Sequence, residues 1–172
     1  IDMNPAVLAL FDLDHTLLPR DTDEQWIEFL LDQGRLDRRV FEAANRDLAA
    51  RYQRGEAQEL EYTEFYLSTL VPFEVGELEA LHAQFMRERV VPAIPAAARA
   101  LIAKHRNLGH LLVLTTATSR FLTAPVAEEL GFVHHIATEP EMKDGRFTGR
   151  VRGTPNMREG KIERLLEWLA ER

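Results

Sequence analysis

The first hydrophobic feature of the chain is an uninterrupted apolar run over Ala6–Phe11, which stops abruptly at Asp12. An apolar run of this length without alternation is typical of a strand that is buried on both faces of a sheet. Two further runs, Leu111–Leu114 and the weaker His135–Thr138, predict two more strands of the same kind. The hydrophobic pattern therefore predicts a sheet whose strands are parallel and largely buried.

Between the first two predicted strands, apolar residues recur at helical spacing. Thr22 followed by Gln25 forms a capping box, which predicts a helix that starts there and ends near Gly34. Three more amphipathic stretches follow before the chain reaches two closely spaced prolines, and they cover residues 36–52, 60–70 and 75–86. Residues 20–90 are thus expected to form four helices without a strand.

The rest of the chain, residues 91–172, alternates between helical and extended patterns. Helices are predicted at residues 96–105, 121–130 and 161–169, and Asp144-Gly145 predicts a tight hairpin between two short strands. This order of elements indicates an α/β fold with a parallel sheet. We expect a Rossmann-like core built from residues 3–19 and 91–172, into which residues 20–90 are inserted as a helical cap.

Composition and charge narrow the function classes. The 172 residues include 21 Lys and Arg against 28 Asp and Glu, so the formal net charge is −7. An acidic balance argues against a nucleic-acid partner, because sequence-independent binding depends on clustered basic residues. No apolar run approaches the roughly 18–20 residues of a membrane span, no secretory signal pattern is visible, and the sequence has no cysteine. We expect a cytoplasmic protein without a membrane partner.

Two carboxylates, Asp12 and Asp14, follow directly after the first predicted strand. The carboxyl ends of parallel strands form the edge where ligands bind in open α/β sheets. Two carboxylates at that edge can take different roles, one as a nucleophile or metal ligand and the other as a general acid and base. The alternative is that both residues only form the turn, since Asp is common there.

Two further residues are candidates for binding an anion. Thr116 follows the second predicted strand, where its hydroxyl could hold a phosphoryl oxygen or could simply cap the next helix. Thr115, Thr118 and Ser119 compete with it by composition. Lys161 begins the last helix, where an ammonium group opposes the helix dipole, so it either faces an anion or is a solvated surface lysine.

In this order, Asp12-Leu13-Asp14-His15-Thr16, Thr116 and Gly160-Lys161 resemble the first three signature motifs of the haloacid dehalogenase-like hydrolases. The match is nearer to the phosphoserine phosphatase-like branch, which places a helical cap between the first two motifs. The stretch Lys143–Gly149 also resembles a hairpin that this branch carries before its lysine. The resemblance covers nearly the whole chain and implies a phosphatase of small phosphorylated metabolites.

The resemblance also implies roles for individual residues. Asp12 would attack the phosphorus of a phosphate monoester and form an aspartyl-phosphate, while Asp14 would protonate the leaving alkoxide and then activate water. Mg²⁺ would be held by the carboxylate of Asp12 and the backbone carbonyl of Asp14. Thr116 and Lys161 would bind the phosphoryl oxygens, as would two backbone N–H groups, those of Leu13 and Ala117.

Substrate recognition is expected to differ from that of phosphoserine phosphatases. Asp21 falls where those enzymes carry an acid that recognises the substrate amine, although it could instead start the first helix. The segment Tyr62–Val71 contains no Arg, whereas those enzymes place one there for the substrate carboxylate. This departure argues against phosphoserine itself as the substrate.

The fourth motif of the family, an acidic cluster that completes the Mg²⁺ site, has no counterpart after Lys161. We therefore expect a longer natural chain, an exposed sheet edge beside the first strand, and weak Mg²⁺ binding with little turnover in these residues. Two alternatives to hydrolysis remain open. One is phosphotransfer or mutase chemistry on the same intermediate, and the other is a catalytically incomplete phosphate-binding or interaction module.

Overall fold

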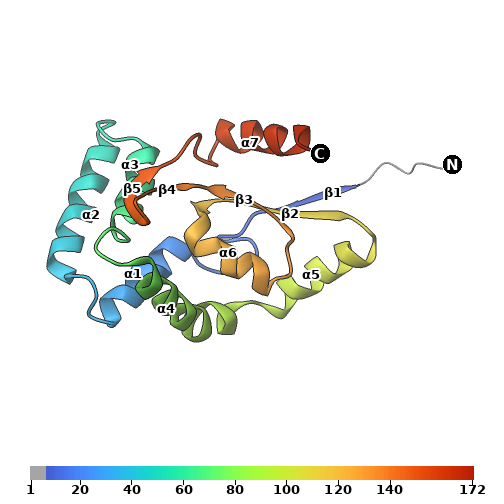
Figure 1. Ribbon diagram of the computed structural model, residues 1–172, viewed down its shortest axis with the longest axis horizontal. Helices are drawn as coiled ribbons and strands as arrows, with labels where there is room; N and C mark the ends of the chain where they lie inside the picture. The colour runs from blue at the N-terminus through green and yellow to red at the C-terminus, as the bar shows by residue number, and fades with distance from the viewer. Residues whose placement is uncertain (1–6) are drawn as a thin grey trace.

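The core is a three-stranded parallel sheet in the order β1-β2-β3 (Figure 1). The computed structural model describes residues 7–172, with β1 at Leu8–Phe11, β2 at Leu111–Ser119 and β3 at His134–Thr138. Ala6, the first residue of the predicted first strand, lies outside the described residues. The parallel α/β core is confirmed, and β1 forms one edge of the described sheet. The prediction that this strand is buried on both faces is wrong: Ala9 and Phe11 are buried, but on the opposite face Leu8 is half-buried and Leu10 is 45% exposed.

Strand β2 is longer than the sequence predicted, because the polar residues after Leu114 continue the strand. Its pairing with β3 is irregular: Thr115 aligns with Ile136 and Ser119 with Thr138. Four residue steps on β2 therefore oppose two on β3, so residues 116–118 arch away from the regular ladder as a bulge. Thr116 lies in this bulge, and Ser119, not Thr116, is the N-cap of the following helix.

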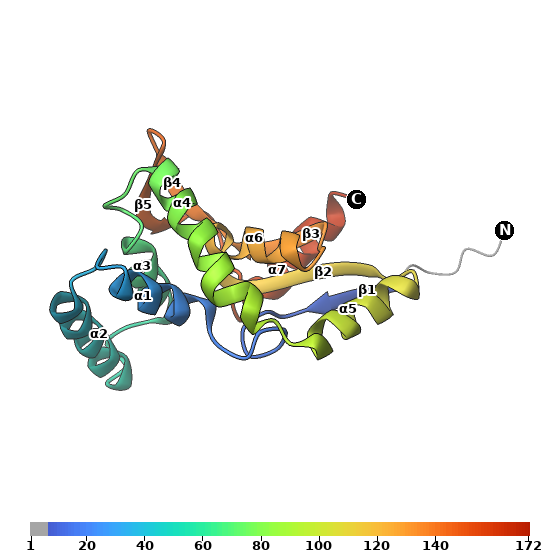
Figure 2. The same cartoon turned by 90° about the horizontal axis from the view of Figure 1, so that it is seen from below.

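The predicted block of helices lies between β1 and β2 in sequence and gathers at the end of the sheet where the strands finish (Figure 2). Its four helices are α1 (Thr22–Asp32), α2 (Arg38–Gln53), α3 (Glu59–Ser68) and α4 (Val75–Phe85). Helix α4 continues into a π-helical turn, Met86–Val90, and a 3₁₀ turn, Val91–Ala93, before the chain returns to the core.

The start of α1 differs from the prediction by one residue. Asp21, not Thr22, is the N-cap, and its side chain accepts a hydrogen bond from the backbone N–H of Glu24 at 2.9 Å. Thr22 is the first helical residue, and its buried hydroxyl instead donates to Asp14. Asp and Thr both cap helices well, so the hydrogen bond from Thr22 to Asp14 decides which of the two residues is the N-cap.

An aromatic cluster joins the inserted helices to the sheet domain. Trp26 stacks on Phe29 within α1, meets Phe85 of α4 edge-on, and contacts Phe121 of α6 at 6.0 Å between ring centroids. Trp26, Phe29 and Phe85 are almost fully buried. Burial of large aromatic side chains is a major source of folding free energy, so this cluster fixes α1 and α4 on the core.

The helices and the hairpin predicted for the rest of the chain are present, although the hairpin lies outside the three-stranded sheet. The division into a core of residues 3–19 and 91–172 and a cap of residues 20–90 stays a prediction. Helices α5 (Ala96–Asn107), α6 (Arg120–Glu129) and α7 (Glu159–Ala170) pack on the sheet, and the hairpin of β4 (Pro140–Lys143) and β5 (Arg146–Val151) packs on α3. Asp144 and Gly145 both have positive φ, as the predicted tight hairpin requires. Within residues 7–172, no helix is long and apolar enough to cross a membrane.

Candidate functional site

Asp12 and Lys161 are brought together although they are 149 positions apart in the chain. The Lys161 ammonium donates to Asp12 Oδ1 at 2.9 Å, and about half of the Asp12 side chain remains exposed. Lys161 lies in the first turn of α7, and the anion that it contacts in the structure is the Asp12 carboxylate. Its binding of a phosphoryl group stays a prediction. The pair places a carboxylate beside a cation at the carboxyl end of β1.

Asp14 is held by hydroxyl groups from two different elements. Its Oδ1 accepts from both the backbone N–H and the hydroxyl of Thr22, at 2.8 and 2.5 Å, and its Oδ2 accepts from the Thr118 hydroxyl at 2.7 Å. Thr22 comes from α1 and Thr118 from the β2 bulge. The carboxyl group of Asp14 therefore has both oxygens occupied and a fixed orientation.

Burial raises the pKa of Asp14 above its usual range, and the nearby Asp21 carboxylate raises it further. The hydrogen bonds from Thr22 and Thr118 act in the opposite direction, because they stabilise the ionised form. Desolvation is the larger effect. A carboxyl group that keeps its proton to higher pH is suited to donate that proton to a leaving group.

Thr116 is buried at the start of the bulge. Its hydroxyl accepts the backbone N–H of Thr118 at 3.2 Å, and its carbonyl accepts a hydrogen bond from the side chain of Asn156 at 2.8 Å. Leu13 is buried beneath the turn that follows β1, where its carbonyl accepts three backbone N–H groups from residues 16–18. The binding of phosphate by Thr116 and by the N–H groups of Leu13 and Ala117 stays a prediction.

The turn into α7 depends on Gly160. A Cβ atom at this position would come within 2.2 Å of the Pro155 carbonyl oxygen, which no side chain tolerates. The backbone N–H of Gly160 donates to the carbonyl of Met157, which closes the turn. The glycine of the Gly160-Lys161 motif therefore allows the chain to fold back tightly enough to direct Lys161 toward Asp12.

Acidic side chains surround the start of α1, next to Asp14. Burial, followed by the charges of Asp21 and Asp14, raises the pKa of the half-buried Asp23 well above its ordinary value. On helix α3, burial and the charges of Asp23 and Asp21 raise the pKa of Tyr66. Carboxyl groups are therefore gathered at the start of α1, where they could accept hydrogen bonds from a cationic group.

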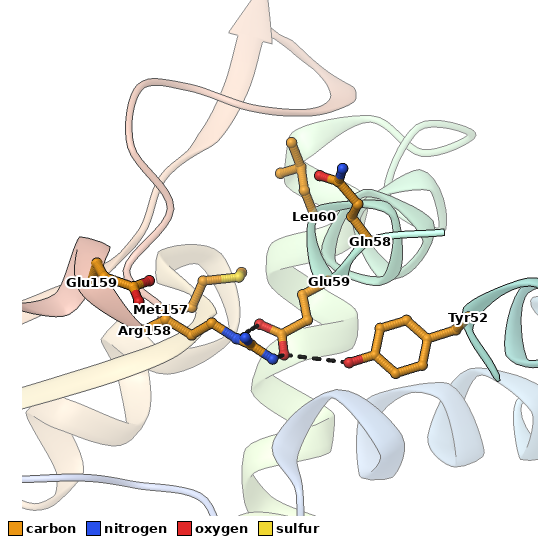
Figure 3. A pocket seen from close by; sticks show the side chains of 7 residues that line it. All are labelled: Tyr52, Gln58, Glu59, Leu60, Met157, Arg158 and Glu159. Carbon is orange, nitrogen blue, oxygen red and sulfur yellow. Dashed lines mark hydrogen bonds and ion pairs between the residues drawn. The ribbon is translucent and has the colours of Figure 1, made fainter. Parts of the chain in front are cut away.

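A cavity of about 410 Å³ lies where α2 and α3 meet the segment before α7 (Figure 3). Arg158, in the segment before α7, donates two hydrogen bonds to the carboxylate of Glu59 at the start of α3. Its Nε donates to one oxygen at 2.7 Å, and its Nη2 donates to the other. The Tyr52 hydroxyl donates to Glu59 from the other side at 3.5 Å. Arg158 has φ = 47°, a backbone conformation rare for a side-chain-bearing residue.

The oxygen atoms at the site fit a divalent cation that shares its coordination with the substrate. Among residues 7–172, no group of three or more His, Asp or Glu side chains is arranged to hold a metal. Asp12 keeps an accessible carboxylate, whereas the side chain of Asp14 is bound to threonines, which leaves its backbone carbonyl as the implied ligand. Mg²⁺ commonly takes one or two carboxylates and completes its shell with water and phosphate oxygens.

Sequence reasoning missed two residues that organise the site. Thr22 was interpreted only as a helix cap, and Asn156 was not singled out. Thr118 was named only as a competitor of Thr116, although it holds Asp14. The sequence signal for Thr118 was present, because a hydroxyl-rich run after a buried strand predicts polar groups at the ligand-binding edge.

Comparisons with known proteins show to which family the chain belongs. The family model described as haloacid dehalogenase-like hydrolase matches residues 9–172. A histidinol-phosphatase of Neisseria meningitidis is 37% identical over 166 residues, which cover 96% of this chain and 75% of that protein. A probable phosphatase of Mycobacterium tuberculosis is 26% identical over 145 residues, which cover 83% of this chain and 50% of that protein.

Solved structures support the same assignment. A protein of unknown function from Bordetella pertussis has a TM-score of 0.90 and 46% identity, over 98% of this chain and 76% of that one. A substrate-bound phosphoserine phosphatase has a TM-score of 0.62 and 20% identity, over 98% of this chain and 72% of that one, which shows a shared fold. The chain therefore belongs to the haloacid dehalogenase-like hydrolase family, and its fold is that of the phosphoserine phosphatase-like branch.

Proposed function

We propose that this chain carries the phosphoryl-transfer site of a Mg²⁺-dependent phosphatase that hydrolyses a small phosphate monoester. The observation that carries the proposal is the pairing of Lys161 with Asp12 beside a partly buried Asp14 whose pKa is raised. Phosphoryl transfer requires an aligned nucleophile, a proton donor for the leaving oxygen and neutralisation of spread negative charge. These three residues supply one of each.

In the proposed reaction, a carboxylate oxygen of Asp12 attacks phosphorus, and the bond from phosphorus to the ester oxygen breaks. The leaving alkoxide takes the proton of Asp14. Water then gives a proton to Asp14 and attacks the aspartyl-phosphate, which releases orthophosphate and restores Asp12. Lys161 and Thr116 bind the phosphoryl oxygens throughout. When bound, Mg²⁺ would neutralise part of the phosphate charge and orient it toward Asp12.

The electrostatics at the start of α1 support a substrate that also carries an amine. Asp21 and Asp23 lie at the start of α1, and their charges act on Asp14 or on one another and on Tyr66 of α3. Segment 62–71 of the cap contains no Arg to bind a carboxylate. Histidinol phosphate, the substrate named for the Neisseria relative, has an amine and an imidazole but no carboxylate. It fits this charge pattern better than phosphoserine does.

The first experiment measures orthophosphate release from histidinol phosphate, phosphoserine and glycerol phosphate, with millimolar Mg²⁺ or with a chelator. We expect hydrolysis that depends on Mg²⁺ and is fastest for histidinol phosphate, but slow for all three compounds, because the acidic cluster that completes the Mg²⁺ site has no counterpart after Lys161. Absence of hydrolysis of all three compounds at millimolar Mg²⁺ would contradict the proposed function. Transfer of the phosphoryl group to an added alcohol in place of water would favour a phosphotransferase.

The amine-binding part of the proposal is tested with Asp21→Asn. Asn caps a helix as well as Asp does, so the start of α1 is preserved while the negative charge is removed. We expect kcat/KM to fall about tenfold for histidinol phosphate, because a hydrogen bond to a charged group is lost, and to stay unchanged for glycerol phosphate. The matched control is Asp37→Asn, at the exposed N-cap of α2. An equal effect on both substrates would exclude amine recognition by Asp21.

A further inference from the structure

A single buried amide, Asn156, connects the two halves of the site. The residue is fully buried in the segment between β5 and α7. Its side-chain Nδ2 donates to the Thr116 carbonyl at 2.8 Å, the Thr115 hydroxyl at 3.0 Å and the Ile136 carbonyl at 3.1 Å. Its backbone N–H donates to the Thr138 hydroxyl at 2.9 Å. Asn156 therefore contacts both β2 and β3 at the edge that carries the site.

These contacts fall where the regular ladder between β2 and β3 is interrupted. The bulge of residues 116–118 starts after the aligned pair Thr115 and Ile136. A bulge leaves backbone carbonyls without their usual partners, and buried unpaired carbonyls are destabilising. The Asn156 amide provides donors for two of them, one on each strand. It replaces the missing ladder bonds and keeps the bulge in place.

The orientation of the amide group follows from its partners. Carbonyl oxygens only accept hydrogen bonds, so the NH₂ group of Asn156, and not its oxygen, must face Thr116 and Ile136. Within the described residues, the side-chain oxygen of Asn156 is buried and has no hydrogen-bond partner. The contribution of this side chain to its neighbours is therefore donation alone, which makes it sensitive to loss of the NH₂ group.

On its other side, Asn156 begins the turn that leads to Lys161. Met157 donates its backbone N–H to the Pro155 carbonyl, and the close approach of Gly160 to the same carbonyl tightens the turn. Lys161 follows in the first turn of α7 and reaches Asp12. The distance between the bulge and the Lys161 ammonium is thus set by a short segment that is anchored at Asn156.

We propose that Asn156 is a positioning residue that holds the Thr116 bulge and the Lys161 turn in register, so that both groups meet the same phosphoryl oxygens. This inference rests on the proposed function, because Thr116 and Lys161 are its phosphate-binding groups. Asn156 does not touch the substrate. It acts through two neighbours that do, and through Thr118, which belongs to the same bulge and orients Asp14.

The test is the isosteric substitution Asn156→Asp, which replaces the donating NH₂ group with an oxygen that repels the two carbonyls. We expect kcat to fall about 100-fold, because displacements near 1 Å at reacting groups have effects of this size. Orthophosphate affinity, measured by calorimetry with Mg²⁺ present, should fall about tenfold or more, because both of its proposed binding groups move. The matched control is Asn107→Asp, on the exposed end of α5, which should change neither quantity.

A purely structural role predicts a different result. It would lower the melting temperature of Asn156→Asp but leave kcat and orthophosphate affinity of the folded protein within twofold of the parent, and this result would overturn the inference. Loss of turnover without loss of orthophosphate affinity would also overturn it, because the phosphate-binding groups would then be undisturbed. Parallel losses in a variant with a native circular dichroism spectrum support it.

If Asn156→Asp does not fold, Thr138→Val decides the question. This substitution keeps the buried shape of Thr138 but removes the acceptor for the Asn156 backbone N–H. A folded Thr138→Val variant should lose orthophosphate affinity and kcat together, and unchanged values would overturn the inference. A parent protein that neither hydrolyses phosphate esters nor binds orthophosphate would overturn the proposed function and this inference with it. An active parent with an unaffected variant overturns the inference alone.

Discussion

Two neighbouring regions are built with opposite kinds of interaction: the floor of the site, beneath Asp12 and Asp14, and the cavity between α2, α3 and the segment before α7, which we call the mouth. At the floor, neutral donors from Thr22, Thr118 and Asn156 are buried and hydrogen-bonded to fixed partners. At the mouth, Arg158 and Glu59 form an ion pair whose side chains are 66% and 36% exposed. The floor joins α1 and the segment before α7 to strands of the core, whereas the mouth joins α3 to the segment before α7 (Figure 3).

This difference indicates what each region contributes. A buried hydrogen bond cannot be exchanged for water, so breaking it leaves an unsatisfied group and shifts the atoms that it held. An exposed ion pair exchanges readily with water, and such pairs contribute about 0–1 kcal/mol to stability. We therefore expect catalytic geometry to depend strongly on the floor and only weakly on the mouth. The predictions below separate these two contributions.

The largest effect is expected at the floor, from Asp12→Asn. The amide keeps the size of the side chain but is a poor nucleophile, so turnover of the most reactive substrate should fall at least about a thousandfold. The variant should remain folded, because the Asp12 side chain is about half exposed. Orthophosphate release and circular dichroism are the measurements.

The control for Asp12→Asn is Asp144→Asn, the same substitution in the exposed hairpin turn between β4 and β5. Asn tolerates the positive φ of this position as well as Asp does. The control should keep parental activity. Turnover by Asp12→Asn within tenfold of the parent would show that another group is the nucleophile.

A smaller effect at the floor is expected from Thr118→Val, which removes one donor from Asp14. That donor stabilises the carboxylate, so its loss should raise the pKa of Asp14 further. Because Asp14 acts in its protonated form, the rate declines as pH rises through its pKa. The alkaline limb of the kcat/KM profile should therefore move to higher pH. We also expect kcat to fall about tenfold, because the carboxyl group loses part of its orientation.

Thr63→Val is the control for the loss of a threonine hydroxyl, because Thr63 donates only to the backbone of its own helix α3. Its pH profile should match that of the parent. A shift of the alkaline limb to lower pH in Thr118→Val would contradict the assignment of Asp14 as the proton donor, since removing a donor to a carboxylate cannot lower its pKa.

The parallel sheet and the place of Asp12 at its edge could be predicted because each depends on a local pattern. An apolar run that ends in Asp-Leu-Asp specifies a strand and its ligand-binding edge, and a lysine that opposes its helix dipole indicates a nearby anion. The Asp144-Gly145 hairpin was equally local, since only a few residue types adopt positive φ. The pairing of Lys161 with Asp12 could not be predicted, because it joins residues 149 positions apart.

The bulge and its partners could not be predicted, because they depend on contacts over long distances in the chain. Residues Thr115–Ser119 are polar and look like a loop, yet their hydroxyl groups are buried against Asp14, 104 positions from Thr118, and against Asn156, 41 positions from Thr115. Asn156 follows a proline and reads as an ordinary turn residue. No single-sequence signal distinguishes a turn asparagine from one that replaces missing sheet bonds.

The smallest effect is expected at the mouth, where Arg158→Ala and Arg158→Gly form an informative pair. Both substitutions remove the ion pair with Glu59, so both should change kcat less than threefold and weaken the cap contact by at most about 1 kcal/mol. Only Gly also relieves the backbone strain at φ = 47°, so Arg158→Gly should be more stable than Arg158→Ala by about 1 kcal/mol. Urea denaturation measures the difference, and 1 M salt should abolish the part that is due to the ion pair. A loss of kcat in both variants as large as that in Thr118→Val would contradict the division between floor and mouth, because it would place an exposed ion pair among the groups that fix the catalytic geometry.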